Sequence, residues 1–275
     1  GQSSASCSRP KPTIRAISPA PPNSTSATRT IAPSSALPIH NARVINTANA
    51  DHLGSVQALL VGLKGSGKPL LHTSGSSVVG DDARGGFCSP HVFDEQTPWV
   101  INPFKQARRD IDLLVLSGVN DGIKSAVICP SLIYGVGTGL NPNSVQIPFL
   151  ASNAQERGAV EIVGQGLNVW ANVHIEDVAS LYQLVLEKGP GGAFYFAENG
   201  EASYADLGQA LAQRLGLQDV VHLEPEVAAE RWGVARAYFS FGSNSRVRAR
   251  RAREELGWAP QHTSVINWIA NEAQF

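Results

Sequence analysis

The chain has 275 residues, of which 43% are hydrophobic and 16% are charged, and its formal net charge at pH 7 is −1. This length is enough to bury a sizeable core, either as one large domain or as two small ones. The near-neutral charge gives no indication of nucleic-acid binding, and no apolar run reaches the roughly 18 residues of a membrane span, so we expect neither kind of partner. The three cysteines have no metal-binding spacing, which favours a reducing compartment and predicts a cytoplasmic protein.

Residues 1–42 differ in composition from the rest of the chain. Ser, Thr, Pro and Ala dominate them, the first acidic residue is Asp51, and the first aromatic residue is Phe87. Such a segment buries too little apolar surface to offset its ordering entropy, and its prolines oppose helix and central strand. Three interpretations compete: a disordered tail, a basic and Ser-rich transit peptide, or a truncated or mistranslated head joined to a genuine domain. We predict a disordered or atypical head over residues 1–42.

From residue 43 onward, short apolar runs alternate with helical patterns. In chain order we expect a strand, a helix, a strand, a helix and a strand at residues 43–47, 51–63, 70–73, 104–117 and 125–129. A further helix begins near Ser144, strands follow at 160–163 and 193–197, and helices span 175–187, 204–215, 226–232, 246–256 and 264–272. Strands that alternate with helices predict an α/β fold with a parallel sheet.

Hydroxyl and glycine residues follow two of the predicted strands. Residues 71–80 read Leu-His-Thr-Ser-Gly-Ser-Ser-Val-Val-Gly, and residues 129–135 read Cys-Pro-Ser-Leu-Ile-Tyr-Gly. In open α/β sheets, ligands bind at the carboxyl ends of strands. The two segments therefore predict a nucleotide-binding kind of site at one edge of the sheet.

Four other patterns are weaker. Residues 62–69 nearly match a phosphate-binding loop, but Pro69 replaces the required hydroxyl and the order is helix then strand, so we expect a turn. The glycines of residues 135–139 fit either a phosphate contact or a substrate loop. His174, at a helix start, is more typical of a capping or packed residue, and no spacing indicates a metal site. The basic run 246–253 is interpreted as the solvated face of a helix.

Taken together, the body of the chain resembles the NAD-dependent epimerase/dehydratase family of extended short-chain dehydrogenases/reductases. The resemblance rests on residues 71–80 and 130–135, on Asn-Val-His-Ile-Glu-Asp-Val-Ala at 172–179, and on Leu-Gly-Trp-Ala-Pro at 256–260. It implies a Rossmann-like parallel sheet within an NAD(P)-binding domain at 43–275, with a smaller C-terminal α/β substrate-binding part from about residue 136. It also implies NAD or NADP as cofactor and a small-molecule substrate, either a carbonyl or hydroxyl compound or a sugar-type compound.

The chain departs from this family at its start. The family begins with a strand and a Gly-rich loop that contacts the cofactor pyrophosphate, and no residue before Gly54 supplies such a loop. The match begins at the family's fourth strand, here residues 44–47, so the Rossmann-like sheet is expected to be N-terminally incomplete. That strand would then lie at a sheet edge, and we expect poor solubility, self-association through this edge, or recruitment of part of the head as a substitute strand.

The second departure concerns catalysis. The family's Tyr-x-x-x-Lys pair falls on Phe104 and Arg108, and its catalytic hydroxyl falls on Gly75. Phenylalanine cannot donate a proton, and arginine is a permanent charge. Ser74 and Ser76 flank the glycine and are the candidate substitutes for the missing hydroxyl.

The resemblance assigns roles to a set of residues. The catalytic candidates are Ser74, Ser76 and Arg108, the cofactor-binding candidates are Thr47, Ala48, Thr73, Arg108, Pro130 and Ile133, and the substrate-binding candidates are Asn143, Trp170, Asn172 and His174. Two functions follow from these residues. The first is an atypical NAD(P)-dependent epimerase/dehydratase-like or reductase-like oxidoreductase, and the second is an inactive relative or truncated product that acts as a binding or scaffold protein.

Overall fold

The computed structural model describes residues 43–275, so the expectations for residues 1–42 lie outside the described part of the chain. Its central sheet consists of β1 (Val44–Asn46), β2 (Pro69–Thr73), β3 (Lys124–Pro130) and β7 (Ala193–Ala197), in that order and all parallel. β3 and β7 are almost entirely buried, which is typical of strands covered on both faces. The predicted α/β fold with a parallel sheet is confirmed.

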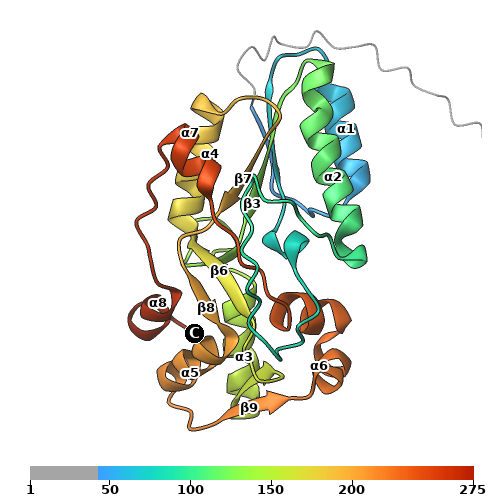
Figure 1. The fold of residues 1–275 in the computed structure, drawn as a ribbon. Coiled ribbons are helices and arrows are strands. Elements are labelled where there is room, and N and C mark those ends of the chain that lie inside the picture. The colour runs from blue at the N-terminus through green and yellow to red at the C-terminus, as the bar shows by residue number, and fades with distance from the viewer. Residues whose placement is uncertain (1–42) are drawn as a thin grey trace, which may run out of the picture. The chain divides into compact units, whose positions relative to one another are not determined.

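Four helices enclose this sheet. α1 (Leu53–Leu63) and α2 (Gln106–Ser117) lie on one face, and α4 (Ile175–Lys188) and α7 (Arg250–Leu256) lie on the other (Figure 1). The phosphate-loop-like residues 62–69 comprise the end of α1, the turn at 64–68 and the first residue of β2, so the predicted turn is confirmed. Within residues 43–275, no helix is long and apolar enough to cross a bilayer.

A second, smaller region builds its own core. A mixed sheet of β4 (Leu132–Tyr134), β6 (Val169–His174) and β8 (Glu201–Ser203) lies near a pair of parallel strands, β5 (Val160–Val163) and β9 (Val220–Leu223). The helices of this region are α3 (Gln146–Arg157), α5 (Tyr204–Leu215), α6 (Pro225–Trp232) and α8 (Val265–Asn271), with a π-helix, η4 (Ala235–Phe241). The chain returns to the first sheet through α4 and β7, so the second region is not one continuous segment.

The predicted helix at residues 246–256 is wrong in its first half. α7 begins only at Arg250, and the preceding segment is extended. Val247 forms an isolated parallel bridge with Phe93, while Arg246 and Arg248 both bind the carboxylate of Glu201. These contacts to distant parts of the chain hold the backbone extended although the local sequence favours a helix.

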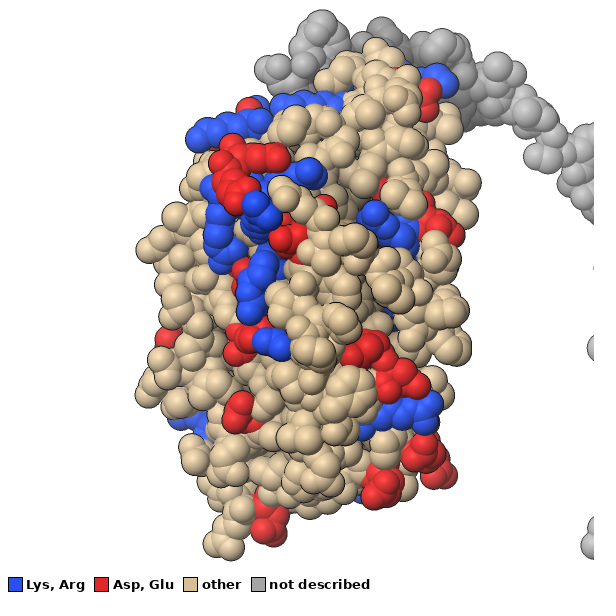
Figure 2. All heavy atoms as spheres, viewed as in Figure 1, with Lys and Arg blue, Asp and Glu red and all other residues tan. Residues whose placement is uncertain are grey.

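The basic run is interleaved with carboxylates rather than forming a positive stripe. Glu201 pairs with Arg246 and Arg248, Glu198 pairs with Arg253, and Arg250 and Arg251 pair with glutamates four residues further along α7. Figure 2 shows the same alternation of blue and red over this part of the surface. The charges therefore compensate each other locally.

β1 lies at the edge of the sheet in the described part of the chain. It pairs with β2 alone, and the side chain of Ile45 is 43% exposed. Such an edge leaves one row of backbone donors and acceptors available for a further strand. Self-association through β1 remains a prediction.

Candidate active site

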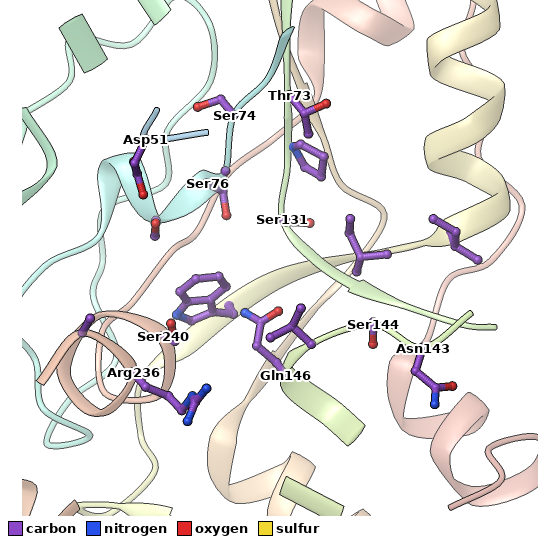
Figure 3. Close-up of a pocket in the computed structure, with 18 of the residues that line it drawn as sticks. Asp51, Thr73, Ser74, Ser76, Ser131, Asn143, Ser144, Gln146, Arg236 and Ser240 are labelled. Carbon is purple, nitrogen blue, oxygen red and sulfur yellow. The ribbon is translucent and has the colours of Figure 1, made fainter. Parts of the chain in front are cut away.

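A cavity of about 840 Å³ opens at the carboxyl ends of β2 and β3. The loop after β2 with the short 3₁₀ helix η1 (Ser76–Val79) lines one side, and the start of α3 and the π-helix η4 line the other (Figure 3). Eight of the predicted site residues line it: Thr73, Ser74, Ser76, Arg108, Pro130, Ile133, Asn143 and Trp170. The predicted strand-end location of the site thus coincides with this cavity.

The two serines proposed as catalytic are both engaged in buried hydrogen bonds. Ser74 Oγ donates to Asp112 Oδ2 at 3.0 Å, and Ser76 Oγ lies 2.7 Å from Ser245 Oγ. Ser74 comes directly after β2, and its backbone N–H continues the pairing with β3 by bonding to Ile128. The sheet therefore fixes the position of Ser74 at the cavity wall.

Arg108, in the first turn of α2, forms part of the cavity wall and is not free in solvent. Its Nε and Nη2 donate to the two carboxylate oxygens of Asp51 at 2.8 and 2.7 Å, and its Nη1 donates to Ser77 Oγ at 2.8 Å. The hydrogen bonds from Arg108 hold the pKa of Asp51 below its usual value. A Cβ at Gly75 would lie 3.1 Å from Arg108 Nη1, so the guanidinium occupies space beside the glycine.

Phe104, at the position of the family tyrosine, does not line the cavity. Its side chain is 77% exposed, and its ring packs on Phe239 with centroids 5.3 Å apart. The turn Pro103–Lys105, η2, instead directs the next residue, Lys105, to the cavity wall. Burial, followed by the charge of Arg108, lowers the pKa of Lys105 to about 8. The side chain that reaches the cavity from this turn is therefore that of Lys105 and not that of Phe104.

Asp112 lies one turn beyond Arg108 and is completely buried. Burial raises the pKa of its carboxyl group to about 7. One carboxylate oxygen accepts from Ser74, and the other has no hydrogen-bond partner within residues 43–275. In the sequence, the signal for this group is an acidic residue on the inward, apolar face of the predicted helix.

Four predicted site residues lie away from the cavity. Thr47 and Ala48 are exposed in the loop after β1, and Asn172 is buried in β6. His174 caps α4, since its Nδ1 accepts from the N–H of Glu176 at 3.3 Å. The prediction that His174 is a capping or packed residue at a helix start is confirmed.

His174 also belongs to a cluster that the sequence spacing did not indicate. Its nitrogen atoms lie within 4.8 Å of ligand atoms of Glu176 and His262, a grouping that could hold a metal ion. However, the two imidazole rings are stacked, with centroids 3.8 Å apart and planes inclined by only 21°, and His262 Nδ1 lies 3.1 Å from Asp177. Ring lone pairs lie in the ring plane, so these nitrogens do not converge on a shared point.

The cavity fits one half of a nicotinamide dinucleotide. Thr73, Pro130 and Ile133 lie at the carboxyl ends of the parallel strands, where the nicotinamide end of such a cofactor binds in Rossmann-like sheets. In the described part of the chain, no Gly-rich loop leads from a strand of the central sheet directly into an α-helix, which is the element that holds the pyrophosphate. The described residues therefore fit the nicotinamide end of such a cofactor, and none of them forms a pyrophosphate loop of this kind.

Comparison with known proteins establishes the class. The model of the NAD-dependent epimerase/dehydratase family matches residues 30–195, and the chain belongs to this family. The oxidase ucsJ of Acremonium sp. is 32% identical, with the match covering 79% of this chain and 72% of that protein. The uncharacterized protein YLL056C of Saccharomyces cerevisiae is 27% identical, over 77% of this chain and 66% of that protein.

Solved structures show the same fold at lower identity. A dTDP-glucose 4,6-dehydratase from Bacillus anthracis in complex with NAD has a TM-score of 0.61 at 22% identity, over 84% of this chain and 73% of that chain. A UDP-glucuronic acid 4-epimerase from Bacillus cereus in complex with UDP-glucuronic acid and NAD has a TM-score of 0.61 at 17% identity, over 80% and 65%. The Rossmann-like fold expected from the sequence is confirmed.

Proposed function

We propose that the cavity is the active site of an NAD(P)-dependent oxidoreductase that interconverts a carbonyl and a hydroxyl group on a small or sugar-type substrate. The observation that carries this proposal is the convergence of the Ser74–Ser77 loop, Arg108 and the strand-end residues Thr73 and Pro130 on one cavity. The family membership of the chain supports the same class of reaction.

Thr73, Pro130 and Ile133 would hold the nicotinamide end of the cofactor, which supplies or accepts a hydride when bound. Arg108 is positioned by Asp51 and would act through Ser77. Because Ser77 Oγ already accepts from Arg108 Nη1, its own O–H proton is free to donate to a substrate oxygen. Ser74 and Ser76 line the same side of the cavity, so this side carries three serine hydroxyl groups with Ser77.

The charges of the cavity indicate an oxygen-rich or anionic substrate. Asp51 is neutralised by Arg108, whereas Lys105 and Arg236 face the cavity without a carboxylate ion pair in the described part of the chain. The guanidinium of Arg236 instead lies over the ring of Phe149, 4.3 Å from its centroid. Asn143 and Trp170 lie on the same substrate-facing side.

The test is turnover at saturating cofactor. A panel of small aldehydes, ketones and sugar nucleotides is mixed with NADH or NADPH at millimolar concentration, and the loss of nicotinamide absorbance is followed. We expect at least one compound to be reduced, with a loss of about 10²–10³-fold in the Ser77→Ala variant. The matched control is Ser66→Ala, an exposed hydroxyl in the turn between α1 and β2.

A second function is favoured by one observation, the exposed Phe104 in place of a proton donor. A non-catalytic relative would bind small molecules in the cavity and reduce none of them. Ligand-detected magnetic resonance with the same panel separates the two functions. Binding without turnover at saturating cofactor would overturn the oxidoreductase and support the binding protein.

A further inference from the structure

Lys105 is the one lysine of residues 43–275 that lines this cavity. Its amino group lies at the cavity wall, 4.9 Å from the centroid of the Phe239 ring, and it forms no ion pair within residues 43–275. Lys64, by comparison, is exposed and forms an ion pair with Asp121 at 2.7 Å, and a hydrogen bond to that carboxylate raises its pKa. The two amines therefore have opposite environments.

Lys105 occupies its position because of the local backbone. Asn102 caps the turn η2 by accepting from the N–H of Phe104, and Pro103 begins this turn. Lys105 is then the residue immediately before α2. An ammonium group near the positive end of a helix dipole is disfavoured, and a neighbouring guanidinium and partial burial act in the same direction.

We propose that Lys105 is a catalytic residue that transfers the proton to and from the substrate oxygen, in place of the tyrosine that this chain lacks. This assignment rests on the proposed oxidoreduction. In the direction of reduction, the carbonyl carbon gains a hydride from the reduced nicotinamide, and the carbonyl oxygen gains a proton from Lys105 Nζ. The amine is left neutral and regains its proton from water at the partly open cavity mouth, so charge and atoms balance.

The groups that face Lys105 are consistent with this role. Arg108 on α2 disfavours the ammonium form, Asp51 in the loop after β1 favours it, and the ring of Phe239 on η4 is uncharged. Burial, which has the largest effect, together with these two charges lowers the pKa of Lys105 to about 8, so both protonation states are populated near neutral pH. A general acid or base works best in that range.

The first test does not depend on cofactor or turnover. The full chain is treated briefly with formaldehyde and cyanoborohydride between about pH 6 and pH 10, and each lysine is mapped by mass spectrometry. A neutral amine condenses with formaldehyde, water leaves, and hydride from cyanoborohydride yields the N-methyl amine. Near pH 8, the neutral fraction of Lys105 should exceed that of Lys64 by about 100-fold or more, although Lys64 is the more exposed group.

The second test uses turnover of the compound found above. Lys105→Arg keeps a cation over Phe239 but cannot release a proton near neutral pH. We expect kcat to fall about 10²–10⁴-fold with little change in KM, and the inflection near pH 8 to disappear from the pH profile. Lys64→Arg is the matched control and should leave both parameters unchanged.

The outcomes separate the two proposals. If Lys105 is methylated only when Lys64 is, or if Lys105→Arg keeps the rate and pH profile of the wild type, the assignment of Lys105 is refuted. If Lys105 is methylated early but no compound is turned over at saturating cofactor, the oxidoreduction is refuted and the proton-transfer role is refuted with it.

Discussion

Replacing Asp112 by asparagine is expected to stabilise the protein increasingly as the pH rises from about 5 to about 8. Asp112 is completely buried beneath the cavity wall, and burial raises the pKa of its carboxyl group to about 7. In an unfolded chain the same group has a pKa of about 3.9. The folded protein therefore binds this proton more tightly than the unfolded chain does.

The sign of the pH dependence follows from this difference. The stability that Asp112 contributes is fully present below about pH 4 and is lost as the pH rises through about 7. A difference of roughly three pKa units corresponds to about 4 kcal/mol over the whole window, of which about 3 kcal/mol falls between pH 5 and pH 8. Asparagine has no titratable proton, so the variant lacks this loss.

The substitution also has a cost that does not depend on pH. Asparagine keeps an oxygen that can accept from Ser74, but its amide group replaces an oxygen that has no partner within residues 43–275. A buried unpaired amide costs about 1–3 kcal/mol. The variant should therefore be no more stable than the wild type near pH 5, within about 1 kcal/mol, and about 1–3 kcal/mol more stable near pH 8.

Urea unfolding at several pH values measures this difference directly. Asp219→Asn, a change at an exposed carboxylate beside β9, is the matched control and should follow the wild type. A constant offset between Asp112→Asn and wild type from pH 5 to pH 8 would show that Asp112 is ionised throughout, and the argument from burial would be refuted.

Four further predictions concern other parts of the molecule. Gly85→Ala should destabilise the fold by about 3 kcal/mol or more, because φ is +76° and a Cβ would lie 1.9 Å from a backbone oxygen. Gly216→Ala, where φ is +68° and no atom lies within 4 Å of the new Cβ, should cost only about 1 kcal/mol. Equal losses of unfolding free energy in urea would contradict this. Phe104→Tyr combined with Arg108→Lys should not create family-level turnover, since residue 104 faces away from the cavity, and robust NAD(P)H oxidation by the double variant would refute this. In fluorescence titrations, NADH should bind no more than about tenfold more tightly than reduced nicotinamide mononucleotide, because the described residues lack a pyrophosphate loop; a much larger ratio would show that another segment supplies that loop. Ile45→Lys should reduce self-association in sedimentation experiments, and a wild type that is already monomeric would exclude association through β1.

The strands and helices with strong local patterns could be predicted from the sequence. The apolar run of β3 and the 3.6-residue spacing of α1 place both elements within a few residues of their observed limits. β4, β6, β8 and β9 were not predicted. β4 and β8 have only three residues each, and β6 carries asparagine and histidine among its apolar positions. These strands are defined by their partners across the sheet rather than by their own sequences.

The candidate site was predictable only where it lies at strand ends. Thr73 and Pro130 line the cavity because each ends a central parallel strand, and that position can be read from the sequence. The π-helix residues Arg236 and Ser240 join the cavity through packing that leaves no local pattern. Lys105 was missed because the direction of a side chain in a 3₁₀ turn depends on the turn itself and not on the count of residues.

The extended segment around Ser245 makes completion of the cavity a late event in synthesis. Ser245 Oγ donates to the carbonyl of Ser76, 169 residues earlier in the chain, and Asn244 binds Asp81. At ribosomal rates of about 5–20 residues per second, this interval lasts on the order of 10–30 s. Throughout that time the loop at residues 74–77 is already synthesised but lacks the extended segment that fixes it. In a nascent chain stalled before residue 245, the loop at 74–77 would lack these hydrogen bonds. Chaperones and proteases could then bind this part of the chain until translation ends.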